Sequence, residues 1–171
     1  MTGRGGSVHQ PLRGGSEPSP ASIEKLSELS PDRVGELLID SEAAGSRIVR
    51  RLVDDWTAGA NRFDRPGEAL FGASMAGRLV GVCGLNVDPY AADPRVGRVR
   101  HLYVLTACRR YGVGRQLVAR IVEVAAGRFD SLRLRTNNPA AARLYEAAGF
   151  GASAEGECTH VMDLPRRPLR A

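Results

Sequence analysis

The hydrophobic period of the chain changes between residues 98 and 128, and this change restricts the folds that the chain can adopt. Residues 98–105, "RVRHLYVL", alternate as a β-strand does, whereas residues 114–128, "GRQLVARIVEVAAGR", carry apolar side chains at helical spacing. A turn with two glycines joins these runs, and a second alternating run, "SLRLRT" at 131–136, follows the helix. Because a helix that crosses between two strands of one sheet makes them parallel, the sequence predicts two parallel neighbouring strands here.

The other predicted elements surround this unit in a regular order. The pattern predicts a first strand at residues 22–29, helices at 31–45 and 46–59, a hairpin of two strands at 68–87, a helix at 138–150 and a last strand at 159–165. A meander of antiparallel strands that passes into a strand–helix–strand unit needs a mixed sheet with helices on its faces. We therefore predict an α/β (α+β) fold with a mixed, largely antiparallel central sheet of six to seven strands, flanked by about four helices.

The two ends of the chain differ in composition from the part between them. Residues 1–20 are rich in Gly, Ser, Pro and Arg, so we expect a flexible tail there, and the Arg- and Pro-rich residues 166–171 are expected to form a C-terminal tail. One domain is then predicted over residues 21–165. No apolar run reaches the roughly 18 residues of a membrane span, and the start of the chain lacks the apolar core of a secretory signal. We expect no membrane partner.

Cysteine content and charge narrow the function classes. Cys83, Cys108 and Cys158 show no CxxC spacing, which argues against a metal cofactor or a disulfide framework and favours a cytoplasmic location. The net charge of +5 favours an anionic ligand or a nucleic acid. Aromatic residues make up only 5% of the chain, so no platform for base stacking is visible and we expect no nucleic-acid partner.

The turn between strand and helix has the form Arg109-x-x-Gly112-x-Gly114. Free N–H groups and the positive dipole end at a helix start bind anions, and glycines allow an anion to approach the backbone closely. Arg109, Arg110 and Arg115 add forked donors suited to phosphate oxygens. The alternative is a glycine-rich turn with solvated arginines. A Walker loop would need Gly-Lys-Ser/Thr and a Rossmann fingerprint a third glycine, and the chain has neither.

Two segments in order resemble the GCN5-related N-acetyltransferase (GNAT) superfamily. "LYVLTACRRYGVGRQLV" contains the family's Arg/Gln-x-x-Gly-x-Gly/Ala pattern, and "LRLRTNNPAAARLYEAAGF" contains its Asn-x-x-Ala-x-x-x-Tyr-x-x-x-Gly-Phe pattern from Asn138 to Phe150. The resemblance extends, more weakly, over residues 22–164. It implies the GNAT fold and transfer of an acetyl group from the cosubstrate acetyl-CoA to a primary amine by direct attack in a ternary complex, with no metal. The acceptor would be an amine of a small molecule or of a protein.

The resemblance also implies roles for particular residues. The backbone of Leu102, Tyr103 and Val104 would pair with the pantetheine arm, and Asn138 would lie near that arm. The pyrophosphate would be held by Arg109, Arg110, Tyr111, Gly112, Val113, Gly114 and Arg115. Tyr145 would offer its hydroxyl group to the departing CoA sulfur, because a thiolate leaving group needs a proton or a hydrogen bond. The alternative for Tyr145 is a packed tyrosine whose hydroxyl reaches solvent.

The predicted strand departs from the family pattern on the face that would meet the acceptor. Many members carry a glutamate general base where this chain has Arg98 (the family also often has Pro at the position of Thr106 and Gly at that of Arg110). Regular alternation would place Arg98, Arg100, Leu102 and Val104 on one face, and Val99, His101 and Tyr103 on the other. We expect Arg98 and Arg100 either to bind an anionic part of the acceptor or to pair with Asp88 or Asp93.

Arginine cannot accept a proton at neutral pH, so the base must be another group. The candidates are Asp88, Asp93, Glu155, Glu157, His160, or water leading to bulk solvent. On a regular strand His101 points to the other face, which predicts a buried histidine with satisfied hydrogen bonds.

Two other functions remain open at this stage. The missing glutamate allows a catalytically idle acyl-CoA-binding sensor of the same fold, and the arginines allow a nucleic-acid-binding protein. Oligomeric state is also open, because an apolar edge strand either pairs with a second copy to form a homodimer or is covered.

Overall fold

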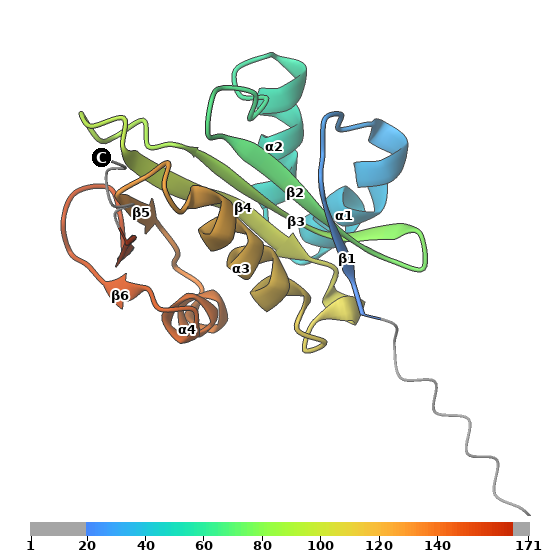
Figure 1. The fold of residues 1–171 in the computed structure, drawn as a ribbon. Helices are drawn as coiled ribbons and strands as arrows, with labels where there is room; N and C mark the ends of the chain where they lie inside the picture. Colours follow the sequence, from blue (N-terminus) through green and yellow to red (C-terminus); the bar gives the residue numbers. More distant parts are fainter. Residues whose placement is uncertain (1–19, 166–171) are drawn as a thin grey trace, which may run out of the picture.

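The computed structural model describes residues 20–165 (Figure 1). In chain order its elements are β1 (Ser22–Lys25), α1 (Pro31–Ala43), α2 (Ile48–Thr57), β2 (Ala69–Met75), β3 (Arg78–Val87), β4 (Val96–Val104), the 3₁₀ turn η1 (Thr106–Cys108), α3 (Val113–Ala125), β5 (Ser131–Leu134), α4 (Pro139–Ala147), β6 (Gly151–Ala152) and β7 (His160–Asp163). The tails predicted at residues 1–20 and 166–171 lie outside the described residues, except for Pro20.

The strands form one seven-stranded sheet in the order β1-β2-β3-β4-β5-β7-β6. β4 and β5 pair in parallel, and the other neighbours in the sheet are antiparallel. The predicted fold class and the predicted parallel pair are therefore confirmed. The sequence did not predict η1 and β6, because three and two residues are too few to show a hydrophobic period.

The helix starts follow the local sequence. The Ser30 side chain accepts a hydrogen bond from the N–H of Arg33 at 3.4 Å, and Pro31 occupies the first position of α1. α4 begins in the same way, with Asn138 as the cap and Pro139 at the first position. A side-chain acceptor followed by proline satisfies the donors at a helix start and fixes its first φ angle, so both starts could be predicted.

Helices cover both faces of the sheet. A β-carbon built on Gly81 of β3 would lie 3.1 Å from Leu117 of α3, whereas one built on Gly84 would lie 2.4 Å from Phe63, which follows α2. α3 therefore packs on one face, while α1, α2 and the segment after α2 pack on the other (Figure 1). Leu117 and Leu52 of α2 are fully buried, one on each side of the sheet.

A β-bulge interrupts β4 in the middle of the sheet. Val82 of β3 pairs with Tyr103, but Gly84 pairs with Arg100, so β4 contains one extra residue at this point. His101 lies in the bulge with a left-handed backbone (φ 57°), which non-glycine residues adopt rarely. A bulge changes which face of the sheet the following side chains meet.

The bulge makes the predicted division of β4 into two faces wrong. His101 Nδ1 lies 3.2 Å from the Ile48 carbonyl oxygen of α2, and the Tyr103 hydroxyl donates to Asp40 of α1, so both face the side of α1 and α2. Arg98 and Arg100 face that side as well, because they pair with Asn86 and Gly84 of β3. Val99, Leu102 and Val104 face α3. Regular alternation failed here because one inserted residue shifts the phase of every later position.

Candidate active site

β4 and β5 pair over only three residues of each strand, Val96–Arg98 and Ser131–Arg133. Beyond Arg98 the β5-facing edge of β4 has no strand partner within residues 20–165, while the opposite edge pairs with β3. An unpaired strand edge offers N–H and C=O groups to an added extended chain. The predicted contact of Leu102, Tyr103 and Val104 with a pantetheine arm thus has a free edge available.

The turn after β4 presents backbone donors at the start of α3. Arg110 (φ 69°) and Gly112 (φ 77°) both have left-handed backbones, and no side chain caps α3. Gln116 is the first residue whose N–H bonds to the helix backbone, at 3.0 Å from the Gly112 oxygen. The N–H groups of Val113–Arg115 therefore have no partner inside the helix, which fits a bound anion. This geometry is consistent with the predicted pyrophosphate site.

Glycine is needed at the two positions of the turn for different structural reasons. A β-carbon on Gly112 would meet only the Gln116 side chain, at 4.0 Å, so Gly112 is needed for its positive φ. A β-carbon on Gly114 would lie 2.9 Å from Leu144 Cδ1, so Gly114 also allows α3 to pack against α4. The sequence indicated close approach of an anion as the reason for both glycines, and it could not show this helix contact.

Gly112→Ala is expected to lower the free energy of unfolding by about 1–2 kcal/mol, because alanine is strained in the left-handed conformation. Gly35 is the matched control: it lies inside α1 with no atom within 4 Å of a built β-carbon. Gly35→Ala should raise the same free energy by about 0.5–1 kcal/mol. Urea unfolding of the two variants measures both values. A change in the free energy of unfolding with the same sign in both variants would contradict the claim that Gly112 is needed for its positive φ.

Asp40 of α1 holds the junction between β4 and the turn. Its Oδ2 accepts hydrogen bonds from the Tyr103 hydroxyl at 2.6 Å, the Thr106 N–H at 2.9 Å and the Thr106 hydroxyl at 3.0 Å. The bond from Tyr103, followed by those from Thr106 and the nearby Arg109, lowers the pKa of Asp40, although burial opposes the change. Tyr103 thus turns its side chain to α1, and only its backbone is available at the open edge of β4.

Arg109 folds back over the end of β4. Its Nε donates to the Val104 carbonyl oxygen at 3.1 Å, and its guanidinium lies 5.3 Å from the centre of the Tyr103 ring. Arg110 and Arg115 are exposed in the turn itself. Of the three arginines predicted at the anion site, Arg109 supports the strand end in this structure, and the other two remain open to solvent.

Tyr145 is buried on α4 with a hydroxyl group that forms no hydrogen bond to a described residue. Its ring packs edge-on against Phe150, with 5.7 Å between ring centres. Burial, and then the neighbouring Cys83, raises the pKa of Tyr145 well above its ordinary value. The phenol therefore stays protonated and has a proton to donate.

Cys83 is a buried thiol, and Asn138 caps a helix. Burial raises the pKa of Cys83 to about 12, so this thiol is protonated and a poor nucleophile at neutral pH. Asn138 Oδ1 accepts from the N–H groups of Ala140 at 2.9 Å and Ala141 at 3.3 Å, which makes Asn138 the cap of α4. Its predicted place beside the pantetheine arm stays a prediction.

Arg98 is tied to neighbouring groups, whereas Arg100 is not. Arg98 lies 3.5 Å from Asp88 Oδ1, donates to the Glu157 carbonyl oxygen at 2.9 Å and stacks over the Tyr90 ring. This arrangement fits the alternative in which Arg98 pairs with the preceding loop. Arg100 forms no hydrogen bond or ion pair with another residue of the described range 20–165. Of the two arginines predicted to bind the acceptor, Arg98 is already paired and Arg100 is available to a ligand.

The candidate bases have unequal environments. Asp88 is buried, with Oδ1 accepting from the Tyr90 N–H and Oδ2 without a described partner. Asp93 accepts from the Arg95 N–H, and Glu157 pairs with Arg135 at 3.0 Å. His160 lies against Glu146 of α4, on the face opposite Arg100, and Glu155 is exposed. Within residues 20–165 none of them forms a hydrogen bond or ion pair with His101 of the bulge.

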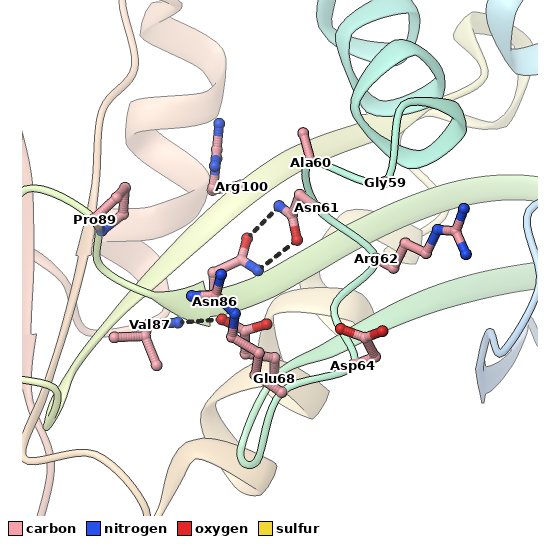
Figure 2. A pocket seen from close by; sticks show the side chains of 11 residues that line it. Gly59, Ala60, Asn61, Arg62, Asp64, Glu68, Asn86, Val87, Pro89 and Arg100 are labelled. Atoms are coloured by element: carbon pink, nitrogen blue, oxygen red, sulfur yellow. Dashed lines mark hydrogen bonds between the residues drawn. The ribbon is translucent and has the colours of Figure 1, made fainter.

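A polar cavity of about 210 Å³ opens on the face of α1 and α2, and Arg100 forms part of its wall (Figure 2). Asn61 and Asn86 exchange two side-chain hydrogen bonds of 2.9 Å across it. Glu68, which is 6% exposed, accepts from the Val87 N–H at 3.1 Å. Its wall also includes Arg62, Arg65 and Asp64, so the cavity combines three arginines, two carboxylates and two amides.

The sequence did not reveal three of these residues. Asn61 follows α2, Glu68 precedes β2 and Asn86 lies near the end of β3, so they meet only in the folded chain. A polar residue at the buried position of Asn86 was the one available signal. Within residues 20–165 no group of three or more His, Cys, Asp or Glu side chains could hold a metal ion. No helix in this range is long and apolar enough to cross a membrane.

Comparison with known proteins identifies the family. The model of the acetyltransferase (GNAT) family matches residues 33–150, so the chain belongs to the GNAT family. It is 35% identical to the aminoglycoside N(6')-acetyltransferase type 1 of Klebsiella aerogenes over 101 residues. This match covers 55% of this chain and 66% of that protein. Over 108 residues it is 32% identical to the N-alpha-acetyltransferase RimI of Mycobacterium tuberculosis, covering 57% and 62%. The matches thus span less than two thirds of each relative.

Solved structures agree with the fold. A candidate acetyltransferase from Exiguobacterium sp. 255-15 superposes with a TM-score of 0.75 at 28% identity, over 84% of this chain and 93% of that one. A candidate acetyltransferase from Salmonella typhimurium, solved with its cofactor acetyl-CoA, superposes with a TM-score of 0.63 at 14% identity, over 87% and 96%. The second likeness supports the fold alone.

Proposed function

We propose that the chain is an acetyl-CoA-dependent N-acetyltransferase that acetylates a primary amine by direct attack in a ternary complex. The observation that carries this proposal is the free edge of Leu102–Val104 followed at once by the uncapped start of α3. Together they offer an extended backbone for an amide-containing arm and free N–H groups for a pyrophosphate. Membership in the GNAT family supports the same reading.

In this proposal the residues of the chain bind, orient and exchange protons. The backbone of Leu102, Tyr103 and Val104 aligns the arm along β4, and the turn from Arg109 to Arg115 holds the pyrophosphate. Acetyl-CoA supplies the activated thioester. Tyr145 donates its proton to the departing sulfur, because its raised pKa keeps the hydroxyl protonated and no other described group occupies it. Asn138 orders the start of α4 and so positions the helix that carries Tyr145.

The amine must lose a proton before or during attack. Arg98 and Arg100 cannot accept it. In this proposal water in the polar cavity carries the proton to bulk solvent past the carboxylates of Asp64 and Glu68, since the cavity is open on one side and lined by polar groups. His101 is a weak base because its pKa is lowered to about 4. Arg98 is held by Asp88, and Arg100, in the wall of the cavity, is left to contact the acceptor.

Acetyl-CoA is expected to raise the free energy of unfolding by about 2.7 kcal/mol at 100 times its Kd, and addition of an amine should release free thiol. Calorimetry with acetyl-CoA and a thiol assay with an amine panel measure the two effects. Binding without thiol release from any amine would favour an idle acyl-CoA sensor. Stabilisation by DNA or RNA and not by acetyl-CoA would contradict the proposal.

A further inference from the structure

We infer that the acceptor is a free polar α-amino acid, whose carboxylate binds Arg100 and whose side chain enters the cavity behind it. This inference rests on the proposed N-acetyltransferase function and names its substrate class.

The charge of the acceptor face favours an anion. Arg98 and Arg100 lie two positions apart on β4, and Arg133 of β5 pairs in register with Arg98. Asp88 and a carbonyl oxygen partner Arg98, but Arg100 has no partner in the described range and Arg133 Nε is buried without one. Like charges at this spacing repel each other, and a bound carboxylate relieves the repulsion while accepting two parallel bonds from one guanidinium.

The size of the cavity favours one amino acid. Its volume of about 210 Å³ is below the roughly 300–1,000 Å³ of sites for drug-sized ligands, and Arg62 and Asp64 stand between it and a second cavity of about 480 Å³ beside residues 27–30. An aminoglycoside is larger and carries several ammonium groups, and the three arginines of the wall outnumber the carboxylates of Asp64 and Glu68. The resemblance to an aminoglycoside acetyltransferase therefore does not extend to the acceptor in this inference.

The polar groups lie where an amino-acid side chain would reach them. Arg100 is next to the bulge at the open edge of β4, so a carboxylate held there places the α-amine beside the thioester. Asn86 lies on the same face, on the strand paired with β4, about 7–8 Å along the diagonal. Asn86 and Asn61 each keep one amide N–H beyond their mutual bonds, and Glu68 has a second carboxylate oxygen. These groups suit a side chain with hydrogen-bonding atoms.

The test compares each free amino acid with its α-amide, which keeps the amine and side chain but lacks the carboxylate. Thiol release with acetyl-CoA is measured for the twenty free amino acids, the α-amides of those that react, a hexapeptide and kanamycin. We expect polar amino acids to react with kcat/KM at least 10-fold above their amides. Arg100→Gln should lower kcat/KM for the free acids about 10- to 100-fold and change that for the amides less than threefold. Arg143→Gln, an exposed arginine on α4, is the matched control and should change neither.

Calorimetry with acetyl-CoA on the same preparations distinguishes a failure of acetyl-CoA binding from a wrong acceptor. If acetyl-CoA does not bind, the proposed function fails. Where acetyl-CoA binds, three results would overturn the inference on the acceptor. The amides and the free acids could show equal kcat/KM, or Arg100→Gln could lower kcat/KM for both alike. The third result is reaction of only the peptide or kanamycin, or of no amine. Retained acetyl-CoA binding by Arg100→Gln shows that the variant is folded.

Discussion

Tyr145→Phe is expected to lower kcat about 10²- to 10⁴-fold while leaving acetyl-CoA affinity and thermal stability unchanged. The proposed acid supplies a proton to the leaving thiolate, and loss of a positioned general acid has an effect of this size. The hydroxyl forms no hydrogen bond in the described structure, so its removal should not destabilise the fold. Steady-state kinetics, calorimetry with acetyl-CoA and a melting curve measure the three quantities.

Tyr90→Phe is the matched control for this prediction. Tyr90 is 61% exposed, its hydroxyl has no partner in the described residues, and the ring over Arg98 is kept in the variant. Its kcat should stay within about twofold of the parent. An equal loss in both variants, or a lower melting temperature for Tyr145→Phe alone, would show that Tyr145 acts through packing and not through its proton.

The fold could be predicted largely from local signals. The switch from strand to helical period around the turn at Gly112 indicated a crossover, and β4 and β5 are parallel as a crossover requires. Ser30-Pro31 marked the start of α1, since capping depends on a few adjacent residues. Such features depend on short-range sterics and hydrogen bonding, which the sequence shows directly.

The candidate site could be predicted only where it consists of backbone. The turn at Arg109–Arg115 was predicted as an anion site because glycines, arginines and a helix start are contiguous. The acceptor face was predicted with the wrong phase, because nothing in "RVRHLYVL" marks His101 as the residue that adopts the left-handed conformation. Pairing with β3 creates the bulge, and that pairing is a property of two strands.

Side chains that meet across long sequence separations could not be predicted. Asp40 bonds to Tyr103, 63 positions later, and Asn61 bonds to Asn86, 25 positions later. Each of these residues is unremarkable in its own segment, since a polar side chain on a helix or loop is usually solvated. Their pairing follows from the packing of α1 and α2 on the sheet.

The free energy of unfolding is expected to fall by about 3 kcal/mol between pH 6.5 and pH 4 because of His101 alone. Burial, and then the nearby Arg100, lowers the pKa of His101 from 6.5 to about 4. Between these values the unfolded chain binds a proton at His101 that the folded protein does not, so acid favours unfolding. The contribution is complete above pH 6.5 and is lost as the pH falls toward 4. Asp40, whose pKa is lowered, loses its contribution only below its ordinary value of 3.8.

His101→Asn tests this prediction, because asparagine tolerates the left-handed backbone of the bulge and does not titrate. Urea unfolding at each pH, followed by the fluorescence of the single tryptophan, Trp56, gives the two stability curves. They should converge by about 3 kcal/mol from pH 6.5 to pH 4, and parallel curves would contradict the buried neutral state. A neutral imidazole must donate from Nδ1 to the Ile48 carbonyl, which leaves the buried Nε2 without a partner. His101 therefore fastens α2 to the bulge, and its pKa of about 4 makes the free Nε2 a weak base for the amine.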